Sequence, residues 1–358
     1  MNKLLELDIS KNKLTTISID AFDGLHNLKR LTLENNRLKD SYSYPLGVFK
    51  YLVSLVYLNI KFNNNDELLY SILPDDVISD LVKLESLELD IVDRRFSVYV
   101  FGDGFSRLSI LKRIKTGACH IDIVNNQTFS NLPHLEFIDL SNCVIYHYVV
   151  GTLSERKQLV YLDMSNVLMK IDSFKDLFEE DIQSSKVKIV KANSMLEYSA
   201  DLPLCFFRIL NDTGIEELYI TNNSFVVAEN VHIKMCNAVP TTLKLLDFSN
   251  NKLTKFCFEI PYLVTLNLKN NFLARYLAHN SYMDNYTGTS ELEKIDLSFN
   301  EIISLSFTIF HFQPKLKFIN LSHNFLSNIT FDLSHNINLQ LLDLSSNRIK
   351  LFKKEQWI

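Results

Sequence analysis

The sequence predicts an α/β solenoid, in which short parallel strands from successive coils form one sheet on the concave face of a curved arc. Three observations predict this fold. The pattern L-x-x-L-x-L-x-x-N-x-L recurs along the 358 residues and is cleanest at Leu339–Ile349. Apolar and polar residues alternate in the first half of each copy, which is the period of a strand with one buried face. Several second halves carry the spacing F-x-x-L.

Aligned on its first position, the pattern gives about fourteen repeats at spacings of 20 to 29 residues. This periodicity is typical of leucine-rich repeats, in which one coil cannot bury its apolar face without neighbours. We expect a single array over residues 1–358 that is truncated at both ends, since another repeat is left unfinished at Ile358. The repeats begin at Leu4, Leu28, Leu55, Leu84, Leu111, Leu135, Leu159, Val187, Ile215, Leu243, Leu263, Leu292, Leu316 and Leu339.

The strand of each repeat is expected around its fourth residue, whose side chain points inward while its two neighbours point outward. The strands should pair in parallel, in chain order. The predicted strand centres are Leu7, Leu31, Leu58, Leu87, Ile114, Ile138, Leu162, Val190, Leu218, Leu246, Leu266, Ile295, Ile319 and Leu342.

The asparagine of the pattern ends each strand, and its side-chain amide can bond the backbone of the next coil. Cys119 and Cys143 replace it in the fifth and sixth repeats, where we expect buried thiols. Val92, Val167 and Met195 replace it in the fourth, seventh and eighth repeats. We therefore expect an interrupted amide ladder and altered curvature in the middle of the array.

Aromatic residues recur in the second halves. Phe22, Phe49, Phe105 and Phe129 share one position in four repeats and are expected to stack as core rather than to hold a cofactor. The segment 174–182 places Phe, Leu, Phe and Ile at helical spacing, which predicts a helical second half there.

The composition points to binding rather than catalysis. The formal net charge of −5 argues against nucleic acid as a generic partner, and no apolar run approaches the roughly 20 residues that span a bilayer. The sequence has no catalytic Ser motif and no phosphate-binding Gly loop. His311, His323 and His335 follow the repeat rhythm and are not expected to bind metal. Asp139 and Asp163 share an open surface that would not raise a carboxyl pKa. We expect a non-enzyme without a cofactor.

Six N-x-[ST] sequons predict glycosylation sites. Those in connecting segments are expected to be the better acceptors, and they are Asn126, Asn211 and Asn285. A glycan on Asn320 would stand on the concave face. The remaining sequons are Asn222 and Asn328.

Five cysteines leave one unpaired in a secreted chain. Cys205 and Cys236 fall in the second halves of adjacent repeats, and coils about 5 Å apart permit a disulfide between them. Cys257 is an alternative partner, and free thiols are the other possibility.

The outward strand positions alternate in charge over three repeats. Lys112, Arg113 and Lys115 of the fifth repeat lie between Glu85, Glu88 and Asp90 of the fourth and Glu136 and Asp139 of the sixth. Cross-strand ion pairs explain this alternation most simply. A basic strip that binds a ligand is the competing interpretation.

The segment Ala274–Glu291 breaks the repeat pattern. It carries Tyr276, Tyr282 and Tyr286 among small polar residues, a composition suited to a contact surface. A loosely ordered insertion is the alternative.

The I-x-x-x-x-F-x-x-L second halves, the Cys-for-Asn exchanges and stretches such as ILNDTGIEELYITNNSF and LKLLDFSNNKL resemble the ectodomains of Toll-like receptors, most closely those of invertebrates. The resemblance covers Leu4–Ile358. It implies a pattern-recognition module of an innate immune receptor, and a parent protein with a signal peptide, Cys-rich caps, a membrane helix and a signalling domain, which this sequence lacks.

A module of this kind is expected on the extracellular face of the plasma membrane or secreted. Its partner would be a macromolecular ligand, either a microbial product or a protein, or a second receptor chain in a dimer. A cell-surface adhesion or structural repeat protein is the alternative. The Phe-type repeats and the six sequons count against a cytosolic scaffold.

Overall fold

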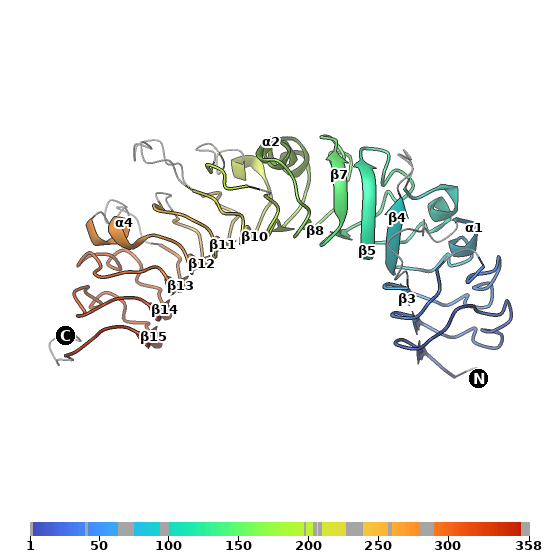
Figure 1. The fold of residues 1–358 in the computed structure, drawn as a ribbon, viewed down its shortest axis with the longest axis horizontal. Coiled ribbons are helices and arrows are strands. Elements are labelled where there is room, and N and C mark those ends of the chain that lie inside the picture. Colours follow the sequence, from blue (N-terminus) through green and yellow to red (C-terminus); the bar gives the residue numbers. More distant parts are fainter. Residues whose placement is uncertain are drawn as a thin grey trace. The chain divides into compact units, whose positions relative to one another are not determined.

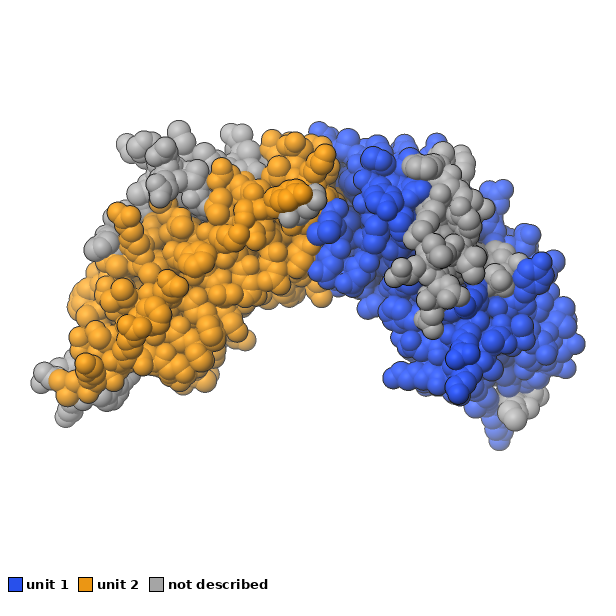
Figure 2. Space-filling model, in the orientation of Figure 1, with its two compact units in different colours: residues 1–168, 180–187 blue, residues 169–179, 188–358 orange. Residues whose placement is uncertain are grey.

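The computed structural model describes residues 3–39, 42–63, 75–93, 100–196, 198–202, 206, 210–226, 239–256, 260–279 and 290–351. The chain forms two compact units (Figure 2). Unit 1 consists of Met1–Leu168 and Glu180–Val187, and unit 2 of Met169–Glu179 and Lys188–Ile358. Each unit is a stack of coils whose strands lie side by side along one face (Figure 1).

The strands of unit 1 pair in parallel. Their centres are in register, so that Leu31 lies between Leu7 and Leu58. Strand β7 was not predicted, and it pairs with the far end of β5. The strands are β1 (Glu6–Asp8), β2 (Arg30–Thr32), β3 (Tyr57–Asn59), β4 (Ser86–Asp93), β5 (Arg113–Val124), β6 (Phe137–Asp139), β7 (Val144–Tyr148) and β8 (Tyr161–Asp163).

Unit 2 repeats this arrangement. Its strands also pair in parallel and in chain order, with Leu246 in register between Leu218 and Leu266. All the predicted strand centres therefore lie in strands, and the expected parallel pairing in chain order is confirmed within each unit. The strands are β9 (Ile189–Lys191), β10 (Glu217–Tyr219), β11 (Leu245–Asp247), β12 (Thr265–Asn267), β13 (Lys294–Asp296), β14 (Phe318–Asn320) and β15 (Leu341–Asp343).

Short helices occur in some second halves, on the side of the coils away from the strands (Figure 1). The helical segment predicted at 174–182 is confirmed by α2 and η2, and Phe174 and Phe178 are buried. Among the described residues, no helix has the length and apolar character needed to cross a membrane. The helices are α1 (Asp75–Ile78), η1 (Asp103–Arg107), α2 (Ile171–Asp176), η2 (Leu177–Ile182), η3 (Leu210–Asp212) and α4 (Ala274–His279).

Buried phenylalanines from successive coils stack in the core, as predicted. In unit 1 the rings of Phe22 and Phe49 lie 6.1 Å apart, and those of Phe101 and Phe129 lie 5.8 Å apart. Phe105 is also buried. Because these rings fill the space between coils, they are committed to the core and are not available to a cofactor.

The expected asparagine ladder is present, but it bonds the preceding coil rather than the next one. Asn36 Nδ2 donates to the carbonyl oxygen of Ile9 at 3.0 Å, and Asn36 Oδ1 accepts from the backbone N–H of Leu14 at 3.1 Å. Equivalent bonds from Nδ2 to the preceding coil are made by Asn63, Asn223, Asn251, Asn271, Asn300, Asn324 and Asn347.

The residue just before the ladder position adopts a left-handed backbone conformation in most repeats. A positive φ lets the chain turn sharply out of the strand, and none of these residues is glycine. They are Lys11, Asn35, Phe62, Asn142, Asn166, Ser194, Asn222, Asn250, Asn270, Phe299, His323 and Ser346. In the fourth and fifth repeats the strands β4 and β5 continue through this point instead.

The expectation of buried free thiols at Cys119 and Cys143 is wrong, because the two residues form a disulfide. They occupy the same position in adjacent repeats, and their Cα atoms lie 4.5 Å apart, within the range that a disulfide bridges. The interrupted ladder is therefore replaced here by a covalent link and by the longer strand pairing of β5 with β4 and β7.

Candidate ligand-binding surface

The register of unit 1 arranges the side chains opposite the core in two columns. The first residue of each strand forms the first column, and the third residue forms the second. Central leucine or isoleucine side chains between them are buried. The first column is Arg30, Tyr57, Ser86, Arg113, Phe137 and Tyr161, and the second is Thr32, Asn59, Glu88, Lys115, Asp139 and Asp163. Asn59, Asp139 and Asp163 in the second column are buried by their neighbours, so the expectation of an open surface around the two aspartates is wrong.

Cations and aromatic rings stack along the first column. The guanidinium of Arg30 lies 3.8 Å from the ring centroid of Tyr57, and that of Arg113 lies 3.9 Å from the centroid of Phe137. Phe137 stacks on Tyr161 with 4.0 Å between centroids and 7° between ring planes. We call Arg113, Phe137 and Tyr161 the aromatic strip. Phe137 and Tyr161 are half-buried and Arg113 is exposed, although each is held by its neighbour.

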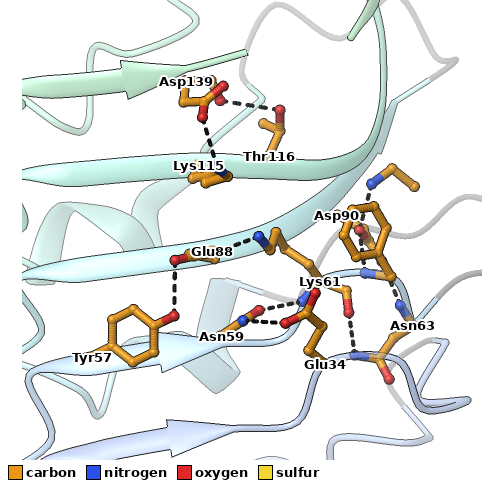
Figure 3. Close-up of polar contacts among 12 residues, drawn as sticks. Glu34, Tyr57, Asn59, Lys61, Asn63, Glu88, Asp90, Lys115, Thr116 and Asp139 are labelled. Carbon is orange, nitrogen blue, oxygen red and sulfur yellow. Dashed lines mark hydrogen bonds and ion pairs between the residues drawn. The ribbon is translucent and has the colours of Figure 1, made fainter. Parts of the chain in front are cut away.

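Glu88 lies at the centre of a polar network in the second column (Figure 3). Its carboxylate accepts a hydrogen bond from Tyr57 Oη at 2.9 Å and pairs with Lys61 Nζ at 2.5 Å. The Lys61 side chain is only 9% exposed, so the ion pair with Glu88 offsets part of the cost of burying its ammonium group. Burial, together with the hydrogen bond and charge of Glu88, raises the pKa of Tyr57 to about 12.

Asp90 was expected to point outward, and that expectation is wrong. The pairing of β4 with β5 shifts register between Leu89 and Ile91, and the Asp90 side chain is buried. Its carboxylate accepts three backbone N–H bonds at 2.8 Å, from Phe62, Asn63 and Ala118 (Figure 3). Asp90 thus takes the accepting role that the Oδ1 atom of a ladder asparagine has in other repeats, but it cannot make the donation to a carbonyl of the preceding coil.

Gly117 leaves room for this carboxylate. A Cβ atom at Gly117 would lie 2.4 Å from Asp90 Oδ1 and 2.8 Å from Lys61 Cβ, which are shorter than real contacts. Because both neighbours are buried, neither can move aside without loss of packing. The small residue is therefore required by the Asp90 and Lys61 network rather than by a turn.

The three cations of the fifth repeat each lie beside a partner. Lys112 pairs with Glu136 at 3.1 Å, Lys115 pairs with Asp139 at 3.2 Å, and Arg113 stacks in the aromatic strip. Partial burial lowers the pKa of Lys115, but the hydrogen bond and charge of Asp139 outweigh burial and raise it. These contacts favour cross-strand pairing over an unpaired basic strip.

From β11 to β15 of unit 2, the third strand residues form a column of acids and amides. Asn267 Nδ2 donates to Asp247 at 3.0 Å, and Asn320 Nδ2 donates to Asp296 at 2.9 Å. The Oδ1 atom of Asn320 also accepts from the backbone N–H of Ser322. Both polar atoms of the Asn320 amide are therefore engaged on the sheet face, although this residue belongs to a sequon.

Other predicted site residues are scattered over the surface. The sequon residues Asn126, Asn211, Asn222 and Asn328 are exposed, and Tyr276 lies half-buried on α4. Several predicted residues fall outside the described ranges, so their placement is not tested. They are Asn285, Tyr282, Tyr286, Cys205, Cys236 and Cys257.

Unit 2 holds one cluster that was not predicted from the sequence. His311 and His335, which we attributed to the repeat rhythm, meet at Asp332, whereas His323 stacks on Phe299 with 4.2 Å between centroids. Asp332 Oδ2 lies 2.7 Å from His311 Nε2 and 3.5 Å from His335 Nδ1. The sequence did hold a signal for this cluster, because both histidines lie nineteen residues after the first leucine of adjacent repeats.

Known proteins resemble this chain along its whole length. The leucine rich repeat family model matches residues 1–38 and 290–350. Toll-like receptor 4 of Pinctada imbricata is 28% identical over 260 residues, covering 70% of this chain and 27% of that protein. Toll-like receptor 8 of Homo sapiens is 26% identical over 399 residues, covering 98% of this chain and 36% of that protein. The chain thus spans only about a third of these curated relatives.

A solved structure supports the same fold. In the Toll–Spatzle complex of Drosophila, described as a molecular hub in development and innate immunity, one chain superposes with a TM-score of 0.57. The match covers 92% of this chain and 45% of that chain, at 17% sequence identity. At this identity the likeness shows the fold, a leucine-rich repeat solenoid.

Proposed function

We propose that this chain, a leucine-rich repeat array similar to the ectodomains of Toll-like receptors, is a ligand-binding section of an innate immune receptor. The receptor would present it on the extracellular face of the plasma membrane or release it. Its ligand would be a macromolecule, either a microbial product or a protein. A protein ligand is supported by the structural neighbour, in which Toll is in complex with Spatzle.

The aromatic strip carries this proposal. Tyr, Phe and Arg are enriched where proteins bind macromolecules, and the aromatic rings bury a large area at low entropic cost. The fold does not need these residues, since the central side chains of the strands supply the core. Arg113, Phe137 and Tyr161 are already ordered by stacking, so a ligand would lose little entropy in fixing them.

Binding suits the sheet face better than catalysis does. Its carboxylates are engaged in structural contacts: Asp139 pairs with Lys115 and accepts from the backbone N–H of Ser141, and Asp163 accepts from Ser165 N and Tyr161 Oη. A general acid or base needs a carboxyl that exchanges protons with a substrate. We therefore propose a non-catalytic surface.

A chimeric receptor tests the proposal. Residues 1–358 are placed behind a secretion leader and before a membrane helix and a Toll-like signalling domain, in cells with a transcriptional reporter. Peptidoglycan, lipopolysaccharide and double-stranded RNA are the probes, and an added chemical dimerisation domain shows that the chimera can signal. We expect at least one probe to activate the reporter and to be retained by the immobilised chain.

The strip is tested with the double variant R113A/F137A. If these residues contribute about 2 kcal/mol or more to binding, the half-maximal probe concentration should rise roughly thirtyfold. The matched control is Lys188→Ala, which removes an exposed cation paired with Glu216 outside the strip. If none of the three probes activates a chimera that still signals when it is chemically dimerised, recognition of these microbial classes would be overturned. Equal responses from R113A/F137A and the control would overturn the role of the strip.

A further inference from the structure

Two successive coils of unit 2 bring a set of metal-binding side chains together. His311 follows the buried Phe310 in one second half, and Asp332 follows the buried Phe331 in the next. The two rings pack edge to face, 5.6 Å apart, so both donor residues are anchored in the core by their neighbours in sequence. The backbone N–H of Asp332 also donates to the carbonyl oxygen of Phe307 at 2.8 Å, which ties the coils directly beside the cluster.

The Asp332 carboxylate is held in place by Ser334. The backbone N–H of Ser334 donates to Asp332 Oδ1 at 2.9 Å, and its hydroxyl lies 2.8 Å from Oδ2. The same hydroxyl lies 3.1 Å from His335 Nδ1. Ser334 thus positions both the carboxylate and the second imidazole, as residues around a metal site do for their ligands.

We propose that His311 Nε2, Asp332 Oδ2 and His335 Nδ1 form a binding site for a divalent transition-metal ion, for which Zn²⁺ is the probe. The three atoms lie within 4.8 Å of one another. A tetrahedrally coordinated ion about 2.0–2.2 Å from each donor requires donor atoms about 3.3–3.6 Å apart. The pair of His335 and Asp332, at 3.5 Å, already meets this spacing, and the pair of His311 and Asp332, at 2.7 Å, needs to open slightly.

Binding would change tautomers without releasing protons from neutral imidazoles. His311 must carry its proton on Nδ1, so that the Nε2 lone pair faces the ion instead of donating to Asp332. His335 must carry its proton on Nε2, with the lone pair of Nδ1 facing the ion. The Ser334 hydroxyl then donates to the carboxylate, which keeps its orientation.

The donor set determines the class of ion. Two imidazole nitrogens and one carboxylate oxygen suit Zn²⁺ and its first-row neighbours, whereas Mg²⁺ and Ca²⁺ need a shell made mostly of oxygens. The His335 side chain is 57% exposed, so solvent has access to a fourth coordination position. A bound ion would clip the second halves of two coils together, on a different part of each repeat from the strands.

Calorimetric titration of the metal-free chain, residues 1–358, with ZnCl₂ tests the site. We expect one ion per chain at this site and a higher Tm when Zn²⁺ is present. His335→Ala removes an exposed ligand, and His311→Gln keeps a donor for Asp332 while removing the ring nitrogen. Each variant should bind Zn²⁺ at least tenfold more weakly and lose the Tm shift. Visible absorption of bound Co²⁺ reports the coordination independently.

The matched control is His323→Ala, which removes a histidine of the same rhythm that stacks on Phe299 away from the cluster. It should bind Zn²⁺ as the unmodified chain does. If His311→Gln fails to fold, the exposed His335→Ala variant decides the result. The proposal is overturned if the unmodified chain binds no Zn²⁺, if His335→Ala binds it equally tightly, or if Mg²⁺ or Ca²⁺ binds as well as Zn²⁺.

Discussion

Replacing Asp90 with alanine should destabilise unit 1 by about 3–5 kcal/mol, because three backbone N–H groups lose their acceptor. The donors are Phe62, Asn63 and Ala118, each 2.8 Å from the carboxylate. A buried donor left without an acceptor costs about 1–3 kcal/mol. We expect the loss of stability to lie near the lower end of three times this cost, since Asp90 is 7% exposed and water can enter part of the cavity that the substitution leaves.

Asp90→Asn separates the acceptor role from the space that the side chain fills. One amide oxygen can still accept from Phe62 and Ala118, but the amide nitrogen would then face the N–H of Asn63. This variant should therefore lose about 1–3 kcal/mol. Glu136→Ala is the control, because its exposed pair with Lys112 should contribute no more than about 1 kcal/mol.

Urea unfolding measures the loss of stability, and amide hydrogen exchange locates it. In Asp90→Ala, exchange should accelerate first at 61–63 and 117–119, whereas the control should exchange as the unmodified chain does. An Asp90→Ala variant as stable as Glu136→Ala, or one with unchanged exchange in these two segments, would refute the view that this carboxylate replaces a ladder amide.

Three further outcomes are expected. Reducing the Cys119–Cys143 disulfide, which closes a loop of 24 residues, should lower the free energy of unfolding by about 3 kcal/mol, as measured by urea unfolding with and without a reductant. Because the pKa of Tyr57 is raised to about 12, its contribution to stability is present below pH 10 and is lost as pH rises toward 12; in Glu88→Gln, ultraviolet titration should find a lower pKa. After secretion, mass spectrometry should find glycan on the exposed sequons but not on Asn320, whose amide is engaged; a glycosylated Asn320 would contradict this.

The strands could be predicted because two independent features locate each of them. One is the alternation of apolar and polar residues within the repeat, and the other is the spacing along the sequence from the equivalent residues of the neighbouring repeat. Leu31, for example, is both the inward residue of RLT and the partner of Leu7 one repeat earlier. The helical segment at 174–182 was predictable for a similar reason, since four apolar residues fall on one helix face.

The middle of unit 1 could not be predicted from the pattern, because the pattern is weakest there. The sequence indicated that the ladder stops at Val92 but not that β4 and β5 would extend through the missing turns. It also gave no sign of the register shift that turns Asp90 inward, since an acid beside a strand normally points to water. The ion pair of the buried Lys61 is made with Glu88 of β4, in this same region.

The disulfide and the histidine cluster were missed although the sequence contained them. Cys119 and Cys143 each lie eight residues after the first leucine of adjacent repeats, and His311 and His335 share a position in the same way. In a solenoid, equal positions in adjacent repeats are neighbours in space. The same reasoning favours these two pairs over Cys205 and Cys236, whose positions in adjacent repeats differ.

The left-handed turns have a consequence for engineering. Six of the twelve turn residues are not asparagine: Lys11, Phe62, Ser194, Phe299, His323 and Ser346. A left-handed conformation costs an ordinary residue about 1–2 kcal/mol that glycine does not pay. Phe62, Phe299 and His323 also make ring contacts, but Lys11, Ser194 and Ser346 have no aromatic ring to lose.

Stability in a repeat array is close to a sum over units and their interfaces, so small gains at separate turns should accumulate. Glycine at Lys11, Ser194 and Ser346 could therefore add a few tenths to about 1 kcal/mol each, after its own entropic cost is subtracted. These turns lie on different coils and well apart in sequence. Glycine substitutions at these turns should therefore stabilise the protein without changing the side chains in the two columns of the sheet.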